Sequence, residues 1–122
     1  MKNAIVTGAS NGIGLEISKK LTENNYYVGM IDIDKENLIK ESEKIHNTIP
    51  IEGDVTNEES IKNALKTFNK TPDLIVNNAG IVIFGSLEEQ SVEDFKKSVD
   101  VSLIGSYLVS RLSIEAMIKK KS

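Results

Sequence analysis

Three glycines stand close together near the start of the chain, in the stretch TGASNGIG at residues 7–14. The apolar run Ala4–Val6 precedes them and an amphipathic segment follows, which predicts a strand, a turn and a helix. Gly8 permits a sharp turn after the strand. Gly12 leaves the backbone open to a phosphate, and Gly14 lets the helix pack close to the sheet. The first helical turn can then bind an anion through its free N–H groups.

Asp32, at the end of the second predicted strand, lies at the distance where an acidic residue meets a ribose 2′-hydroxyl. Its carboxylate would accept hydrogen bonds from an adenosine ribose and repel a 2′-phosphate. Ser10 and Asn11 carry no charge, no basic residue directly follows Asp32, and Lys35 is the nearest cation. We therefore predict NAD rather than NADP, by about tenfold or more. Two simpler interpretations stay open: a plain strand-to-helix loop, and an aspartate that faces water.

The glycine spacing Gly-x-x-x-Gly-x-Gly differs from the usual dinucleotide fingerprint, Gly-x-Gly-x-x-Gly. With NNAG at residues 77–80, it resembles the short-chain dehydrogenase/reductase family, and the resemblance runs from residue 3 to the last residue. It implies an NAD-dependent oxidoreductase that transfers hydride between nicotinamide and a small alcohol or carbonyl substrate. It also implies cofactor contacts at Gly8, Ser10, Asn11, Gly12, Ile13, Gly14, Asp32, Asp54, Val55, Asn78, Ala79 and Gly80.

Two of these segments allow a simpler interpretation as well. Asp54 and Val55 resemble the family's adenine contact, but Asp54 also suits the start of a turn before the next helix. The resemblance places Asn78 and its neighbours against the cofactor ribose, and we expect Thr7 to hydrogen-bond into the same turn. Asn-Asn-Ala-Gly alone would also suit an ordinary turn.

The catalytic residues of the family are largely missing from the chain. The family's Val-Asn-Leu-x-Gly corresponds to VSLIG at residues 101–105, so Ser102 replaces a catalytic asparagine with a shorter side chain. No tyrosine has the family's lysine four residues later, since Tyr26, Tyr27 and Tyr107 are followed there by Met30, Ile31 and Arg111. We interpret Tyr107 as a core or interface residue. The chain alone is expected to be inactive; the alternative is a non-catalytic dinucleotide-binding or interaction module, or an inactive remnant.

The composition of the 122 residues argues against several other classes of function. A net charge of −3 provides no basic field for nucleic acid or an anionic membrane. Without cysteine, and with His46 as the single histidine, we expect no disulfide and no metal site, and a histidine on the surface at a helix end. Lysines 119–121 are interpreted as solvated. We find no room for a signal peptide and no apolar run for a bilayer span, and predict a cytoplasmic protein.

Strands and helices are predicted to alternate four times, which favours a parallel sheet with helices on both faces. Strands are expected at about 3–7, 26–32, 48–52 and 73–77, and helices at about 12–24, 35–45, 57–68 and 92–119. Right-handed crossovers and the glycine stretch predict the strand order 3-2-1-4, with Pro50 in an edge strand. The fold class is α/β, a three-layer Rossmann-type doubly wound sheet, here truncated. Residues 1–122 form one dinucleotide-binding domain, incomplete because the family's members are about twice as long.

Helix caps and buried faces follow from the same patterns. Asp34 and Ser91 are predicted caps, and Thr56 with Glu59 resembles a capping box. Inward-facing residues are expected at Ile13, Ile17 and Leu21, at Leu38, Ile39, Ser42 and Ile45, and at Ile61, Leu65 and Phe68. The last helix is apolar most of the way round and is predicted to be buried on more than one side. An open edge at the fourth strand would favour a homo-oligomer or a completing second chain.

Overall fold

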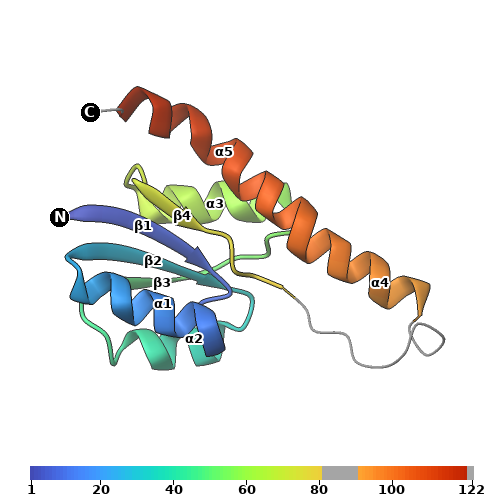
Figure 1. The fold of residues 1–122 in the computed structure, drawn as a ribbon, viewed down its shortest axis with the longest axis horizontal. Coiled ribbons are helices and arrows are strands. Elements are labelled where there is room, and N and C mark those ends of the chain that lie inside the picture. Colours follow the sequence, from blue (N-terminus) through green and yellow to red (C-terminus); the bar gives the residue numbers. More distant parts are fainter. Residues whose placement is uncertain (81–90, 121–122) are drawn as a thin grey trace.

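A computed structural model describes residues 1–80 and 91–120 of the chain. Within them, parallel strands form one sheet in the order β3-β2-β1-β4, which confirms the predicted α/β class and strand order (Figure 1). The strands are β1 (Lys2–Thr7), β2 (Tyr26–Asp32), β3 (Thr48–Glu52) and β4 (Leu74–Val76). The helical elements are α1 (Gly12–Glu23), α2 (Lys35–Ser42), α3 (Glu58–Phe68), α4 (Val92–Val99), the π-helical turn η1 (Asp100–Ile104) and α5 (Gly105–Lys120).

β1 lies in the middle of the sheet, between β2 and β4. It pairs with β2 along its whole length, from Lys2 opposite Tyr26 to Thr7 opposite Ile31. Pro50 lies in β3 at the edge, as predicted for a residue that cannot donate a ladder hydrogen bond. Because the strands are parallel, the loops that follow them open at one edge of the sheet, where the strand order also reverses.

Helices cover both faces of the sheet (Figure 1). Successive strand residues point to opposite faces. Ala4 and Val6 of β1 therefore pack with Leu38 of α2 on one face, and Ile5 packs with Phe68 of α3 on the other. All three β1 side chains are fully buried, as is typical of a strand covered on both sides.

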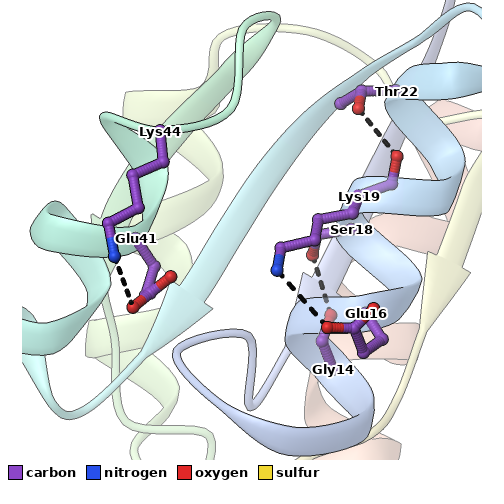
Figure 2. A network of polar contacts seen from close by, with 7 residues as sticks. All are labelled: Gly14, Glu16, Ser18, Lys19, Thr22, Glu41 and Lys44. Carbon is purple, nitrogen blue, oxygen red and sulfur yellow. Dashed lines mark hydrogen bonds and ion pairs between the residues drawn. The ribbon is translucent and has the colours of Figure 1, made fainter.

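α1 approaches the sheet closely because its buried positions carry small residues, Gly14, Ser18 and Thr22. Ser18 Oγ donates to the Gly14 carbonyl oxygen at 2.9 Å, and Thr22 Oγ1 donates to that of Lys19 at 2.8 Å (Figure 2). These buried hydroxyls are thus satisfied within the helix. The prediction for Ile13 is wrong, since its side chain is 73% exposed: the face of small residues, rather than the Ile13 side, meets the sheet.

The caps of two helices are confirmed. Asp34 accepts the backbone N–H of Asn37 at 3.2 Å, and Ser91 accepts that of Asp94 at 3.0 Å. α2 is shorter than predicted and ends at Ser42. Ile39, expected to face inward, is exposed in this short helix, whose buried residues are Leu38 and Ser42.

The capping box predicted at Thr56 and Glu59 is wrong. The cap of α3 is the next residue, Asn57, whose side chain accepts the Ser60 N–H at 2.9 Å. Thr56 Oγ1 instead donates to Asp54 Oδ1 at 2.6 Å, so this hydroxyl belongs to the turn before the helix. An asparagine directly after the threonine competes for the same role, and the turn at Asp54 decides between them.

α4, η1 and α5 form one continuous helix that crosses the molecule beside α3 (Figure 1). Its buried residues are Gly105, Val109 and Ser113, all on one face of α5. The prediction of burial on several sides is wrong for the described residues. Its large exposed side chains include Val92, Phe95, Leu103, Ile104, Tyr107, Ile114 and Ile118. The spacing of apolar residues shows on which sides of a helix they lie. Their burial also requires another part of the structure to cover those sides.

By length and composition alone, this helix, Val92–Lys120, would be able to cross a membrane, contrary to the sequence prediction. The signal is weak, since core helices of soluble proteins meet the same criteria. Its last described turn contacts the segment just before β4: Lys120 Nζ donates to the Thr71 carbonyl oxygen at 3.0 Å and to Asp73 at 3.2 Å. Lys120 is therefore bound rather than freely solvated as predicted, and Lys121 lies outside the described residues.

Candidate functional site

The glycine loop between β1 and α1 has the backbone conformation that its sequence predicts. Gly8 has φ +64° and Gly12 has φ +55°, the left-handed region that favours glycine. A Cβ at Gly8 would lie 2.9 Å from the Ala79 Cα atom, and one at Gly14 would overlap the Gly8 carbonyl oxygen. A Cβ at Gly12, by contrast, would meet nothing within 4 Å. The loop is therefore closed on the side of the sheet and open at Gly12, beside the first turn of α1.

Thr7 and Asn78 join the loops that follow the two neighbouring strands β1 and β4. Thr7 Oγ1 accepts the backbone N–H groups of Asn78 and Ala79, both at 3.0 Å. The Asn78 side chain returns a hydrogen bond to the Gly8 carbonyl oxygen at 3.2 Å. The predicted hydrogen bonding of Thr7 into the NNAG turn is confirmed. This turn also stabilises the glycine loop through Asn78.

The Asp32 carboxylate lies at the carboxyl end of β2 and is half-buried. One oxygen accepts the Ser10 N–H at 3.0 Å and the other accepts the Asp34 N–H at 3.0 Å. A carboxylate has about four acceptor positions, so each oxygen keeps one for a further donor. Asp32 is thus a fixed acceptor beside the glycine loop.

These segments surround a cleft of about 510 Å³, within the usual range for small-molecule sites. Most of the predicted positions meet there: the lining includes Gly8, Ser10, Asn11, Asp32, Asp54, Val55, Asn78, Ala79 and Gly80. The other three predicted contacts, Gly12, Ile13 and Gly14, are in the first turn of α1, outside this lining.

The charges of the cleft are largely negative. Carboxylates come from Asp32, Asp34, Asp54 and Asp100, and among the described lining residues the one basic side chain is that of Lys97. Sequence reasoning missed Lys97 and Asp100, although both lie within five residues of Ser102 and one helical turn of each other. That spacing places them on one helix face, which was the available signal.

Asp54 begins a turn and also lines the cleft. Its Oδ1 atom accepts the Thr56 N–H at 2.9 Å and the Thr56 hydroxyl, so it does begin a turn. It also lines the cleft beside Val55, whose side chain is buried against Gly105 of α5. Holding the turn orients the carboxylate without removing it from the cleft.

Ser102 lies in the π-helical turn η1, and its side chain is exposed. A Cβ built on Gly80 would lie 3.6 Å from Ser102 Oγ, so the serine is close to the end of the NNAG turn. π-Helical turns occur frequently at functional sites. Tyr107, in the following helix α5, is 60% exposed, so of its two interpretations the core residue is wrong and the interface residue stays a prediction.

Nothing among the described residues suggests a metal centre, because no group of three or more histidine, cysteine, aspartate or glutamate side chains is arranged to hold an ion. His46 is exposed just beyond the end of α2, as predicted. The groups that the cleft presents include hydrogen-bond acceptors and backbone N–H groups, and the open Gly12 adjoins it.

The model of the family described as short chain dehydrogenase matches residues 2–122. The chain belongs to the short-chain dehydrogenase family. An uncharacterized oxidoreductase of Thermotoga maritima is 36% identical over 98% of this chain and 49% of its own length. An NAD-dependent glycerol dehydrogenase of Listeria innocua is 30% identical over 96% of this chain and 48% of its own. This short-chain dehydrogenase sequence thus spans about half the length of the curated relatives it matches.

Solved structures agree with this family assignment. A 3-ketoacyl-(acyl-carrier-protein) reductase from Brucella melitensis, complexed with NADH, matches with a TM-score of 0.86 and 29% identity. The match covers 93% of this chain and 49% of the reductase. The site of this short-chain dehydrogenase fits a dinucleotide on its own geometry: an open glycine at a helix N-terminus, a fixed carboxylate, and a cleft of suitable size.

Proposed function

We propose that this chain is the cofactor-binding half of an NAD-dependent oxidoreductase, which transfers hydride between nicotinamide and a small alcohol or carbonyl substrate. The observation that carries the proposal is that the open Gly12 turn directly follows Ser10 and Asn11, which line the same cleft as the fixed Asp32 carboxylate. The cofactor, when bound, would supply the hydride. The chain's own residues bind and orient it.

The segments that line or adjoin the cleft would each hold a different part of a dinucleotide. The first turn of α1, open at Gly12, suits the pyrophosphate, because its backbone N–H groups and dipole favour an anion. Asp32 suits the adenosine ribose, and Asp54 with Val55 suits the adenine. The turn at Asn78–Gly80, with Ser102 close by, suits the nicotinamide ribose.

A preference for NAD over NADP follows from the charges. A 2′-phosphate at Asp32 would meet that carboxylate, and Asp34 also lines the cleft two residues later. Lys97, the basic residue of the lining, belongs to α4 and not to this loop. The family itself does not decide the question, because named relatives include both NAD-dependent and NADP-dependent proteins.

Calorimetric titration of the full chain with NAD⁺ and NADP⁺ tests the proposal. We expect NAD⁺ to bind at least about tenfold more tightly, and Asp32→Ala to remove most of that difference. Glu59→Ala on α3 is the matched control, an exposed acidic residue outside the cleft lining. Failure of the wild-type chain to bind either dinucleotide would contradict the proposal.

Turnover separates this proposal from a non-catalytic binding module, the alternative considered from the sequence. The protein that contains this sequence should oxidise simple alcohols with NAD⁺. Tight NAD⁺ binding without turnover by that protein would favour the binding module instead.

We also propose that the protein associates through the exposed face of the long helix. This face carries large apolar side chains, including Phe95, Leu103 and Tyr107, each at least 59% exposed. Exposed apolar patches of this kind mark association surfaces. Sedimentation velocity would detect the complex, and a strictly monomeric protein at all concentrations would contradict it.

A further inference from the structure

Four residues at the rim of the cleft close a ring of hydrogen bonds. Ser10 donates its N–H to Asp32 at 3.0 Å, and its carbonyl oxygen accepts from Asn37 Nδ2 at 2.6 Å. The Asn37 N–H donates to Asp34 Oδ1 at 3.2 Å, and the Asp34 N–H donates to Asp32 at 3.0 Å. The ring links three separate segments: the glycine loop, the end of β2 and the first turn of α2.

Asn37 differs from the other members of the ring in its place relative to the cleft. Ser10, Asp32 and Asp34 line the cleft, whereas Asn37 is half-buried outside the lining. Ser10 is 1% exposed, so its backbone N–H and carbonyl, which belong to two successive peptide groups, have little access to replacement bonds from water. The Asn37 amide therefore holds the Ser10 carbonyl oxygen from a position outside the cleft lining.

We propose that Asn37 is a positioning residue for the cofactor, which acts through Ser10 to hold the Asp32 carboxylate in the orientation that selects NAD over NADP. The inference rests on the proposed function. Because Asp32 is bonded at both oxygens, it cannot turn away from a 2′-phosphate while the ring is closed. Loss of the Asn37 donor frees the Ser10 carbonyl, so the backbone at Ser10 can turn, and its N–H then no longer holds one of the Asp32 oxygens.

The position itself needs no asparagine for helix formation. Asn37 lies inside the first turn of α2, and asparagine is a weaker helix former than leucine or glutamate. Its side chain makes the contact to Ser10 across 27 residues of sequence, rather than a bond within its own helix. The side-chain amide thus stabilises the glycine loop rather than its own helix.

The test uses Asn37→Leu in the full chain, which removes the amide donor, keeps a similar volume and favours the helix. Calorimetric titration should show NAD⁺ affinity reduced about tenfold, and NADP⁺ affinity reduced less, so that selectivity falls. Asn37→Gln keeps an amide donor and should recover part of the NAD⁺ affinity. Asn63→Leu, an exposed asparagine on α3 at the other face of the sheet, should leave both affinities unchanged.

A double-mutant cycle with Asp32→Ala separates positioning from a purely structural role. If Asn37 acts through Asp32, the double variant should bind NAD⁺ as weakly as Asp32→Ala alone. A fully additive loss, or an unchanged NAD⁺ to NADP⁺ ratio in Asn37→Leu, would overturn the inference and leave the proposed function standing. Should Asn37→Leu fail to fold, Asn37→Ala gives the same comparison, because it also removes the amide donor without adding a charge, and alanine is the best helix former. A wild-type chain that binds neither dinucleotide would overturn both.

Discussion

The glycine loop and the long helix Val92–Lys120 border the same cleft, yet they are held there by different means. In the loop, Thr7, Gly8 and Ser10 all make hydrogen bonds to other segments of the chain. The helix buries only Gly105, Val109 and Ser113 among its described residues, and its opposite side carries large exposed apolar groups. One wall of the cleft is thus held by several buried or half-buried hydrogen bonds between segments. The other is held by a narrow packing contact and by exposed polar contacts at Ser110 and Lys120.

This difference predicts how well each wall of the cleft tolerates amino-acid substitutions. Buried hydrogen bonds and backbone contacts have narrow geometric limits, because a displaced partner leaves a polar group unsatisfied. A helix held along one face can vary its exposed side chains with little effect on its position. We therefore expect the largest effects of mutation at the loop and the smallest at the exposed face of the helix.

We expect the largest loss of stability from Gly14→Ala. The new Cβ would overlap the Gly8 carbonyl oxygen and approach the Asn78 side chain, so α1 would have to move away from the sheet. We expect a loss of at least about 3 kcal/mol of unfolding free energy, measured by urea titration. Gly12→Ala is the control: its Cβ meets nothing, and only the left-handed backbone costs about 1–2 kcal/mol. Equal losses in the two variants would contradict this account of the loop.

Thr7→Val tests the hydrogen bonds between the loops after β1 and β4. Valine keeps the shape of the buried side chain but leaves the N–H groups of Asn78 and Ala79 without their acceptor. We expect a loss of about 1–3 kcal/mol in urea unfolding, together with weaker NAD⁺ binding. Thr7→Ser keeps the hydroxyl and should recover most of the stability. A valine variant as stable as the serine variant would show that the hydroxyl is not needed.

Asp73 connects the sheet to the long helix and allows a test by pH. The backbone N–H of Asn3, followed by the Lys120 ammonium, holds the pKa of the Asp73 carboxyl below its ordinary value. Because the folded state binds the proton less readily than the unfolded state, this contribution is complete above the ordinary carboxyl pKa of about 4 and is lost as the pH falls through the lower, folded value. In Asp73→Asn the urea midpoint should therefore depend less on pH in the acid range. An identical acid profile in the variant and the wild type would contradict this.

The smallest effect on stability is expected at the exposed face of the helix. Phe95→Ser removes a side chain that is 59% exposed, so the unfolding free energy should change by no more than about 0.5 kcal/mol. The same variant should weaken self-association in sedimentation velocity if the helix face is the contact. Val109→Ser, at a fully buried position of the same helix, is the matched comparison and should be clearly destabilising. A large loss of stability in Phe95→Ser at low protein concentration would contradict the exposed position of Phe95.

Much of the loop wall was predictable from the sequence, because its constraints are local. The spacing of Gly8, Gly12 and Gly14 determines a turn, and parallel strands bring Asp32 and Asn78 to the same edge of the sheet. Their common place in the cleft follows from strand order rather than from any single side chain.

Other features depend on contacts that spacing does not reveal. Asn37 and Lys97 reach the site from helices whose patterns look like ordinary surface. Ile13 is apolar at a position where the line of small residues packs instead, and the last helix is apolar without a partner on most of its sides. The predicted cytoplasmic location and the oligomeric assembly stay predictions.

The π-helical turn Asp100–Ile104 determines in which direction the side chains of α4 point relative to those of α5. An α-helix rotates by about 100° per residue, and a π-helical turn contains about one residue more than an α-helical one. Removing one residue from this turn would therefore rotate Lys97 and Asp100 by about a quarter of a revolution relative to Val109. The extra residue therefore keeps Lys97 of α4 and Asp100 of η1 in the lining of the cleft while α5 stays packed against α3.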